Sequence, residues 1–462
     1  MFTRLRIKNF KAWGDQHWKD GVELAPVTLF LGPNSAGKTS LLQPLLLLQQ
    51  TFASPDRSLD LYLGGKKGDV LDLGTYEQVI HDHKLGAELG FGLQLADVAR
   101  RHYPAGPSKS DELSDLPDGL TCSEVRAALD YEVTYGHATG SLHLKHLKLH
   151  HGDLRVAISR SSKGAYRLAA PGYAAPTAAD GSPVPKREYK PEKSVMLSDP
   201  ARQMVNSSRL GTDDLTLALV QAIGGIQYLG PLRERPQSTY LWGGQTPGEI
   251  GSRGEDAVPA LLANLNATKK SGRGSIVMEV SRWLKEMGVA DGLAIEQIGT
   301  SRFYEVMLTT AGRKANLVHV GFGVSQVLPM IVLALTAPEG STIIAEQPEI
   351  HLHPSAQTAL ANLLVETAKK RRLQFLIETH SEHLFRRLQF LVADKQISRE
   401  DCRLYFIDRD SSGEAHLDPL EMDPYGRVRN WPKHFFGDAI GETERHMEKV
   451  FERMDAGNGD GR

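Results

Sequence analysis

The chain has 462 residues, of which 40% are hydrophobic and 24% charged, the composition of an ordinary globular protein. Lysine and arginine number 54 against 56 acidic residues, so the formal net charge is −2 and no general basicity indicates nucleic acid. The two cysteines have no metal-ligand spacing and no signal peptide is visible, which predicts a cytoplasmic protein. The most apolar stretch, 327–337, contains a proline and is too short to span a bilayer, so no membrane contact is expected.

The first predicted elements are strands. Leu5 and Ile7 alternate with basic residues, which is typical of a strand with one buried face. A second, apolar strand over 27–31 runs into a glycine-rich turn. An apolar helical run over 41–48 follows, in which Pro44 is expected to cause a kink.

The turn between that strand and helix matches the pattern GxxxxGK[ST] in full. In such a loop backbone N–H groups face the β-phosphate, the lysine reaches the β- and γ-phosphate oxygens, and the threonine hydroxyl ligates Mg²⁺. Lys38 and Thr39 hold those positions, so the sequence predicts a site for ATP and Mg²⁺. The predicted nucleotide-binding residues of this loop are Gly32, Pro33, Asn34, Ser35, Ala36, Gly37, Lys38, Thr39 and Ser40.

The middle of the chain differs in composition. Residues 104–119 and 171–193 are rich in proline, glycine and polar residues and are predicted to be loops. Between them, 127–169 is predicted to form short antiparallel strands, with a bulge or turn at Lys145–His146 where the leucine alternation shifts. Four histidines there could form a metal or nucleic-acid surface, although a solvated strand face is the favoured interpretation. They are His143, His146, His150 and His151.

Helical periodicity returns later and predicts helices over 277–288 and 325–335. The segment 321–326 precedes the second of these. A loop of small residues that ends in serine at a helix start can bind a γ-phosphate through N–H groups and the hydroxyl, although an ordinary helix cap has the same pattern. Gly323, Ser325 and Gln326 are therefore predicted to contact nucleotide.

A short apolar run, 342–345, is predicted to be a buried parallel strand, and Glu346 at its end is the predicted Mg²⁺ ligand beside Thr39. The next residue is Gln347, whose amide can orient an attacking water but cannot accept its proton. Three interpretations stay open: slow hydrolysis with ATP used mainly as a clamp, Glu349 as the base, or an engineered substitution at position 347.

Two histidine motifs follow. His351 and His353 could suggest zinc, but no further ligands are nearby, and a loop that contacts a second subunit is favoured. His380 follows the next predicted strand, 374–377, and should face the same crevice as Glu346. It is predicted to hydrogen-bond a γ-phosphate, with a structural buried histidine as the alternative.

The order of these motifs resembles one branch of the ABC ATPases. The phosphate loop, GFGVSQ at 321–326, EQPEIHLHP at 346–354 and ETHS at 378–381 are together similar to the RecF/SMC/OLD-like group, which includes PARIS- and Septu-like ATPases of prokaryotic defence systems. Segments 6–11, 227–233, 248–255 and 426–436 are similar to that group as well. The chain departs from it at Gln347, where the group normally has glutamate, and in having no long coiled coil.

The resemblance implies a dimer of heads that sandwiches two ATP molecules. Lys38, Thr39, Glu346 and His380 of one copy would face Gly323 and Ser325 of the other. Gln78 is the possible counterpart of the glutamine that contacts magnesium, and Gln347, Glu349 and His380 are the expected catalytic residues.

The expected fold is α/β: an ABC-type ATPase head with a mostly parallel core sheet, an antiparallel β subdomain and a helical lobe. The expected parts are the phosphate-loop part of the core (1–85), an inserted β-rich region (86–213), a helical lobe with the signature-like segment (214–335), and the rest of the core with a terminal docking helix (336–462).

The expected function is that of a slowly hydrolysing, nucleotide-dependent dimeric switch in antiviral defence that controls a separate nuclease or toxin subunit. A RecF-like DNA-binding repair ATPase is the alternative. Asp408 and Asp410 could mimic the metal pair of a nuclease, but 410–413 is predicted to be a hairpin turn and little room remains for such a domain. The expected partners are a second copy and an effector protein, with DNA as a further candidate.

Overall fold

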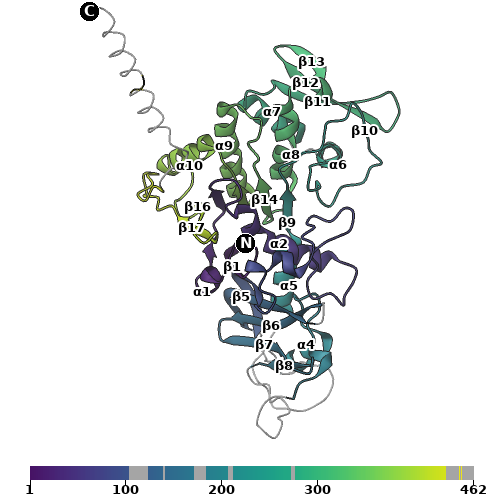
Figure 1. Cartoon of the computed structure of the whole chain (residues 1–462). Helices are drawn as coiled ribbons and strands as arrows, with labels where there is room; N and C mark the ends of the chain where they lie inside the picture. Colours follow the sequence, from purple (N-terminus) through teal and green to yellow (C-terminus); the bar gives the residue numbers. More distant parts are fainter. Residues whose placement is uncertain are drawn as a thin grey trace, which may run out of the picture.

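In a computed structural model, three β-sheets and their covering helices form the described part of the chain (Figure 1). Structure is described for residues 1–102, 123–138, 141–170, 184–206, 212–271 and 276–432, and for residues 447 and 449. Some predicted features therefore lie outside the described residues. These are Cys122, the loop over 104–119, most of the loop over 171–193, residues 435–436 and most of the docking helix.

A six-stranded sheet, in the order β17-β16-β3-β15-β14-β9, lies at the centre of the fold. All neighbouring pairs are parallel except β16 and β17. Its strands are β3 (Val27–Leu31), β9 (Ile226–Leu229), β14 (Thr342–Glu346), β15 (Gln374–Glu378), β16 (Cys402–Arg409) and β17 (Ala415–Pro419). Every residue of β3, β14 and β15 is buried, because both faces of the sheet are covered. The sheet is thus the mostly parallel core that the sequence predicts.

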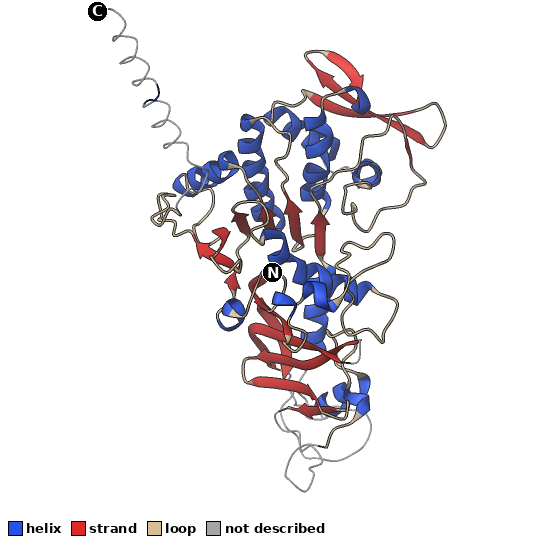
Figure 2. Cartoon of the chain, viewed as in Figure 1, coloured by secondary structure: helices blue, strands red, loops and turns tan. Residues whose placement is uncertain are grey.

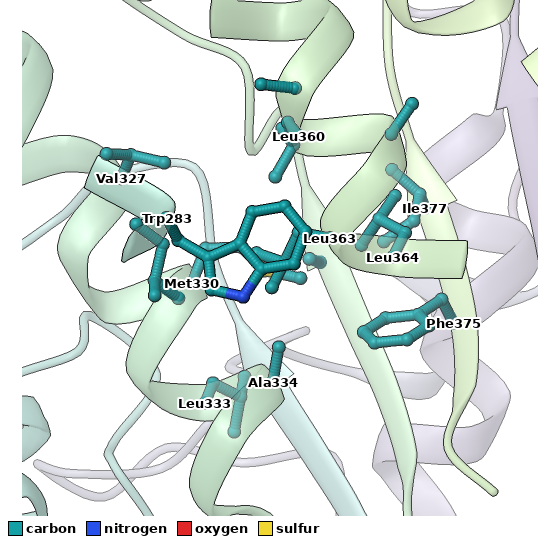
Figure 3. Packing of buried hydrophobic residues seen from close by; sticks show 14 of the residues in the cluster. Trp283, Val327, Met330, Leu333, Ala334, Leu360, Leu363, Leu364, Phe375 and Ile377 are labelled. Carbon is teal, nitrogen blue, oxygen red and sulfur yellow. The ribbon is translucent and has the colours of Figure 1, made fainter. Parts of the chain in front are cut away.

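A helical layer covers one face of this sheet. Its helices are α6 (Ala257–Ser271), α7 (Ile276–Glu286), α8 (Phe322–Thr336), α9 (Pro354–Arg371) and α10 (Glu382–Ala393). Trp283 of α7 is fully buried at the centre of the layer, between α8 and α9 (Figure 3). Val327 and Met330 approach it from α8, and Leu360 approaches from α9. Burial of such a large side chain fixes how these helices pack on the sheet.

The opposite face of the parallel sheet packs against α2 (Lys38–Ala53), α5 (Thr212–Gly224) and a second sheet. That sheet has seven strands in the order β2-β1-β4-β5-β6-β7-β8 and is antiparallel (Figure 2). The strands are β1 (Phe2–Lys8), β2 (Val22–Glu23), β4 (Leu89–His102), β5 (Ser123–Ala138), β6 (Ser141–His151), β7 (Leu154–Arg160) and β8 (Tyr166–Ala169). One core unites this sheet with Phe30, Ile344 and Leu376 of the parallel sheet.

The predicted bulge in β6 is confirmed: Thr134 pairs with His146 but Tyr135 pairs with Leu144, so Lys145 is skipped. The favoured interpretation of the four histidines is wrong for two of them. His143 and His151 are buried, and the ring of His151 bonds the carbonyl oxygen of Val98 at 2.8 Å. This hydrogen bond to a backbone carbonyl offsets part of the cost of burying the His151 ring.

A small sheet lies at the far end of the helical layer (Figure 1). Its strands are β10 (Tyr240–Leu241), β11 (Gly292–Gln297), β12 (Phe303–Thr310) and β13 (Arg313–Asn316). The remaining short helices are α1 (Gln16–Lys19), α3 (Tyr76–Val79) and α4 (Asp199–Asn206), with single 3₁₀ turns at His81–His83, Arg187–Tyr189 and Leu317–His319.

Several predicted boundaries shift. Helix α8 begins at Phe322, three residues earlier than predicted, so the signature-like segment is the first turn of the helix rather than a loop before it. Strands β14 and β15 each extend one residue farther, to Glu346 and Glu378. The hairpin turn at 410–413 is confirmed, because Asp410 Oδ1 accepts hydrogen bonds from the backbone N–H groups of Ser412 and Glu414.

Candidate functional site

The glycine-rich loop joins β3 to α2 at the carboxyl end of the parallel sheet. Gly32 has φ of 139° and Gly37 has φ of 117°, which side chains other than glycine rarely adopt. A Cβ on Gly32 would lie 2.0 Å from the carbonyl oxygen of Ile407 on β16. Arg409, at the end of the same strand, donates from Nε to the carbonyl oxygen of Ser35 at 2.7 Å. The loop is therefore held against β16 by close packing and by a charged hydrogen bond.

Lys38 begins α2 and its side chain folds back over the loop. The ammonium donates to the carbonyl oxygens of Gly32 at 3.1 Å and Pro33 at 2.7 Å. Burial lowers the pKa of Lys38, while the neighbouring carboxylate of Glu378 opposes this effect. The ammonium is thus held where a lysine of this motif meets nucleotide phosphates.

Glu378, to which the sequence reasoning assigned no role, lies directly beside the predicted metal ligand. The hydroxyl of Thr39 donates to Glu378 Oε2 at 2.6 Å, and Lys38 Nζ lies 3.7 Å from Glu378 Oε1. The contact arises because β15 is the neighbour of β3 in the sheet, so the end of β15 meets the start of α2. Its position directly after an apolar run, like that of Glu346, was the available signal.

These side chains border an open cavity of about 220 Å³. Its lining comes from the glycine-rich loop, the start of α2, the turn after β1 and the ends of β15 and β16. The lining residues are Lys11, Ala12, Ser35, Gly37, Lys38, Thr39, Ser40, Gln43, Glu378 and Arg409. Asn34 and Pro33 are exposed in the same loop, while Ala36 is buried. The cavity can hold an anion beside Lys38 and a cation beside Thr39 and Glu378.

Glu346 ends β14 and pairs in register with Glu378 on β15. It accepts a hydrogen bond from the Tyr228 hydroxyl at 2.7 Å and is only 8% exposed. Burial raises the pKa of Glu346 to about 7, and the nearby charge of Glu378 adds to this effect. Two buried carboxylates on adjacent strands repel each other, which favours a cation between them.

The turn after Glu346 brings the other predicted catalytic residues to the same edge. Gln347 has a left-handed backbone with φ of 45°, and its N–H donates to the carbonyl oxygen of Glu378 at 2.7 Å. Glu349 is buried, its pKa is raised by burial, and Oε1 accepts a hydrogen bond from the N–H of His380 at 3.0 Å. Glu349 therefore holds the turn that carries His380.

The ring of His380 is exposed at this edge. Its pKa is lowered, first by partial burial and then by the positive charge of Lys38. The neutral ring therefore predominates at neutral pH, with one nitrogen able to donate a hydrogen bond and the other able to accept one. Lys38, Glu346, Glu378 and His380 thus lie along one end of the parallel sheet.

The signature-like residues lie elsewhere. Ser325 is buried in the first turn of α8, and its hydroxyl donates to the carbonyl oxygen of Phe322 at 2.9 Å. A Cβ on Gly323 would lie 3.3 Å from the carbonyl oxygen of His351. Ser325 borders a different, small cavity with residues such as Pro329 and Tyr240. Gln326, beside it, is half-buried. This segment is therefore not part of the cavity beside Lys38.

The remaining candidates have local structural contacts. Gln78 Oε1 accepts a hydrogen bond from the N–H of Thr75 at 2.8 Å and so caps its own short helix, α3. His353 Nδ1 caps the start of α9 by accepting from the N–H of Ser355. Within the described ranges, no group of three or more histidine, cysteine, aspartate or glutamate side chains could hold a metal ion alone. A cation at Thr39 would need ligands from a bound nucleotide and water.

Comparison with known families addresses the same regions. Residues 257–385 match the family model of the AAA ATPase domain, a range that contains α8, Glu346 and His380. This part of the chain is therefore similar to an ATPase domain. Residues 397–445 match a second family model, described as a protein of unknown function (DUF3696). No curated protein matches the sequence.

Three of the solved structures that are similar to this chain are SMC heads. The SMC head domain from Thermotoga maritima has 13% identity and a TM-score of 0.35, over 91% of this chain and 99% of that one. An SmcHead bound to the C-winged helix domain of ScpA has 10% identity and a TM-score of 0.43, over 92% and 98% of the two chains. A Pyrococcus furiosus Smc head bound to ScpA has 9% identity and a TM-score of 0.38, over 97% and 99%. At these values the likenesses carry no conclusion about function.

Of the helices in the described residues, none is both long and apolar enough to cross a membrane.

Proposed function

We propose that the chain binds ATP with Mg²⁺ in the cavity beside Lys38, and that two copies close around the nucleotide. One observation supports this proposal above the others. Lys38, Thr39, Glu346 and His380 share one edge of the sheet, while Ser325 lies outside that cavity. A site of this type that is divided between two surfaces needs a second copy to complete it.

The residues of the cavity suit the ligand. Loop N–H groups and the ammonium of Lys38 would bind phosphate oxygens, and the hydroxyl of Thr39 with the carboxylate of Glu346 would hold the cation. Bound Mg²⁺ neutralises phosphate charge as the terminal phosphate is transferred. His380, at the same edge, would hydrogen-bond the terminal phosphate.

We propose that hydrolysis is slow. Gln347 can orient a water but cannot take its proton, and Glu349 already accepts a hydrogen bond from the His380 N–H. Glu378 is already engaged by the hydroxyl of Thr39 and the ammonium of Lys38, so it does not replace the missing base either. ATP would then act mainly as a clamp, and its slow loss would time the opening of the dimer.

The biological role that we propose is a switch in prokaryotic antiviral defence, in which the closed dimer controls a separate nuclease or toxin subunit. The support is the similarity of the motif series to ATPases of such systems. A salt-dependent DNA titration with and without ATP tests the alternative. ATP-dependent DNA affinity would favour a RecF-like repair ATPase over the switch.

A mixing experiment tests the divided site. Lys38→Ala removes the phosphate contact, while Ser325→Glu places a negative charge in the first turn of α8, where the partner's terminal phosphate would lie. Each variant alone should neither dimerise with ATP in sedimentation velocity nor hydrolyse it. An equal mixture should recover part of both properties, because each mixed dimer keeps one intact site. No recovery in the mixture, with both variants folded, would exclude completion by a second copy.

A further inference from the structure

One buried cation near the site has no described role. Arg233 lies four residues beyond the end of β9, in the loop that leaves the edge of the parallel sheet. The residue is only 6% exposed. Its Nη2 donates to the backbone carbonyl oxygen of Glu346 at 3.4 Å, a long contact. Its Nε and Nη1 are buried and, within the described part of the chain, have no hydrogen-bond partner.

Such a side chain needs an acceptor. A buried guanidinium whose donors have no acceptors strongly destabilises the folded state. Burial accordingly lowers the pKa of Arg233 to about 10, while Tyr228, Glu346 and Glu349 oppose this effect. This destabilisation remains unless a negatively charged group contacts Nε and Nη1 of Arg233 when the protein is active.

The nearby carboxylates are already engaged. Glu346 Oε1 accepts from the Tyr228 hydroxyl, and Glu349 Oε1 accepts from the His380 N–H. Glu349 Oε2 is buried and unpartnered among the described residues, so an ion pair with Arg233 is the structural alternative. These described side chains form no such pair with each other.

The place of Arg233 in the sheet indicates what could meet it. Strand order at this edge is β9-β14-β15-β3, and β9 and β15 flank β14 on either side. Arg233 therefore approaches Glu346 from the side opposite to Glu378 and Lys38. A nucleotide held at Lys38, with its metal ion at Glu346, would present its terminal phosphate between the ammonium of Lys38 and the guanidinium of Arg233.

We infer that Arg233 is a binding residue for the terminal phosphate of the nucleotide held by the same chain. The inference rests on the proposed function. Arg233 would then make the site sensitive to whether a third phosphate is present. Closure would depend on ATP rather than ADP even though the chain has Gln347 in place of a catalytic glutamate.

The test compares the affinities of ATP and ADP, measured by calorimetry with Mg²⁺, for the wild type, Arg233→Lys and Arg233→Ala. Because hydrogen bonds to charged groups contribute the most, loss of Arg233 should lower the ratio of ATP to ADP affinity by roughly tenfold or more. Lysine, which keeps the charge but loses the forked donors, should give an intermediate ratio. Arg253→Ala, which removes an exposed arginine paired with Glu234, should leave the ratio unchanged.

The outcomes are distinct. A wild type that binds no nucleotide contradicts the proposed function itself. If the wild type binds ATP but has no preference for it over ADP, the inference is wrong. It is also wrong if the variants keep the wild-type ratio of ATP to ADP affinity and lose only thermal stability, in which case Arg233 is a structural partner of Glu349. Should Arg233→Ala fail to fold, Arg233→Lys decides alone, since an unchanged ratio in that variant overturns the inference and a lowered ratio supports it.

Discussion

The two large sheets of this protein differ in how many of their faces are buried. Strands β3, β14 and β15 are buried along their whole length, so only their ends can reach solvent or ligand. In β7 of the antiparallel sheet, buried residues such as Val156 alternate with residues such as Arg155 that face water. The parallel sheet therefore concentrates its chemistry at one edge, whereas the antiparallel sheet keeps a free face.

This difference explains where charge is found. Lys38, Glu346 and Glu378 are all buried at the carboxyl edge of the parallel sheet, where their charges interact strongly. On the antiparallel sheet, by contrast, Arg6 on β1 is paired with Asp130 and Glu132 on β5, across the intervening strand β4. The ion pairs of Arg6 balance its charge within the sheet, whereas the close carboxylates of Glu346 and Glu378 indicate a place where a cation binds.

The largest expected effect is at the parallel edge. Lys38→Ala should weaken ATP binding by on the order of a thousandfold, because two charge-assisted hydrogen bonds to phosphate are lost. Calorimetry measures it, with Lys370→Ala as the control, since Lys370 is an exposed lysine paired with Glu366. Retention of wild-type affinity by Lys38→Ala would contradict the phosphate-loop assignment.

Two substitutions test whether β15 of the parallel sheet is more deeply buried than the exposed face of β7. Ile377→Ala, in the buried strand β15, should lower the free energy of unfolding by about 2–5 kcal/mol. Arg155→Ala, on the exposed face of β7, should change it by no more than about 0.5 kcal/mol. Urea denaturation followed by circular dichroism gives both values. Equal effects at the two positions would show that the sheets do not differ in burial as described.

The pH dependence of stability tests the buried carboxylate. The pKa of Glu346 is raised from 4.5 to about 7, so the folded state holds its proton more tightly than the unfolded state. The resulting stabilisation is complete below pH 4.5 and is lost as pH rises to about 7, a change of up to about 3 kcal/mol. Without ligands, Glu346→Gln should be more stable than the wild type above pH 7, and the difference should shrink on acidification. A constant difference from pH 5 to pH 8 would argue against a raised pKa.

The smallest effect concerns the carboxylate beside Thr39. Without a cation, Glu378 repels phosphates and occupies the hydroxyl of Thr39. Glu378→Gln should therefore lower the ratio of ATP affinity with Mg²⁺ to that in EDTA by roughly tenfold, a change expected from one close charge. Glu382→Gln, an exposed residue that pairs with Arg386, serves as the matched control. A ratio unaffected by Glu378→Gln would remove Glu378 from the cation site.

Much of this edge could be predicted from the sequence, for physical reasons. Parallel strands place their carboxyl ends together. Glu346 at the end of one strand, His380 just after another, and the pattern around Lys38 were therefore sufficient to predict that these residues share one edge. The bulge at Lys145 was predictable because a one-residue slip inverts the side-chain alternation.

Other features depend on contacts between distant segments. Glu378 meets Thr39 only because β15 lies beside β3, and Arg233 reaches Glu346 only because β9 lies beside β14. Strand order is set by tertiary packing and cannot be obtained from local periodicity. The start of α8 was misplaced because Gly323 lowers helix propensity, and contacts elsewhere in the fold outweigh that preference.

The contact between β16 and the glycine-rich loop sets a lower limit on the piece of this chain that can work alone. A fragment that stops at residue 385, where the match to the AAA ATPase domain ends, would lack both Ile407 and Arg409. Its glycine-rich loop would lose the packing of Ile407 against Gly32 and the hydrogen bond from the guanidinium of Arg409 to Ser35. Truncated fragments should therefore retain the hairpin through Pro419. In shorter fragments, a lower nucleotide affinity would reflect the loss of the β16 contacts and not a property of the glycine-rich loop itself.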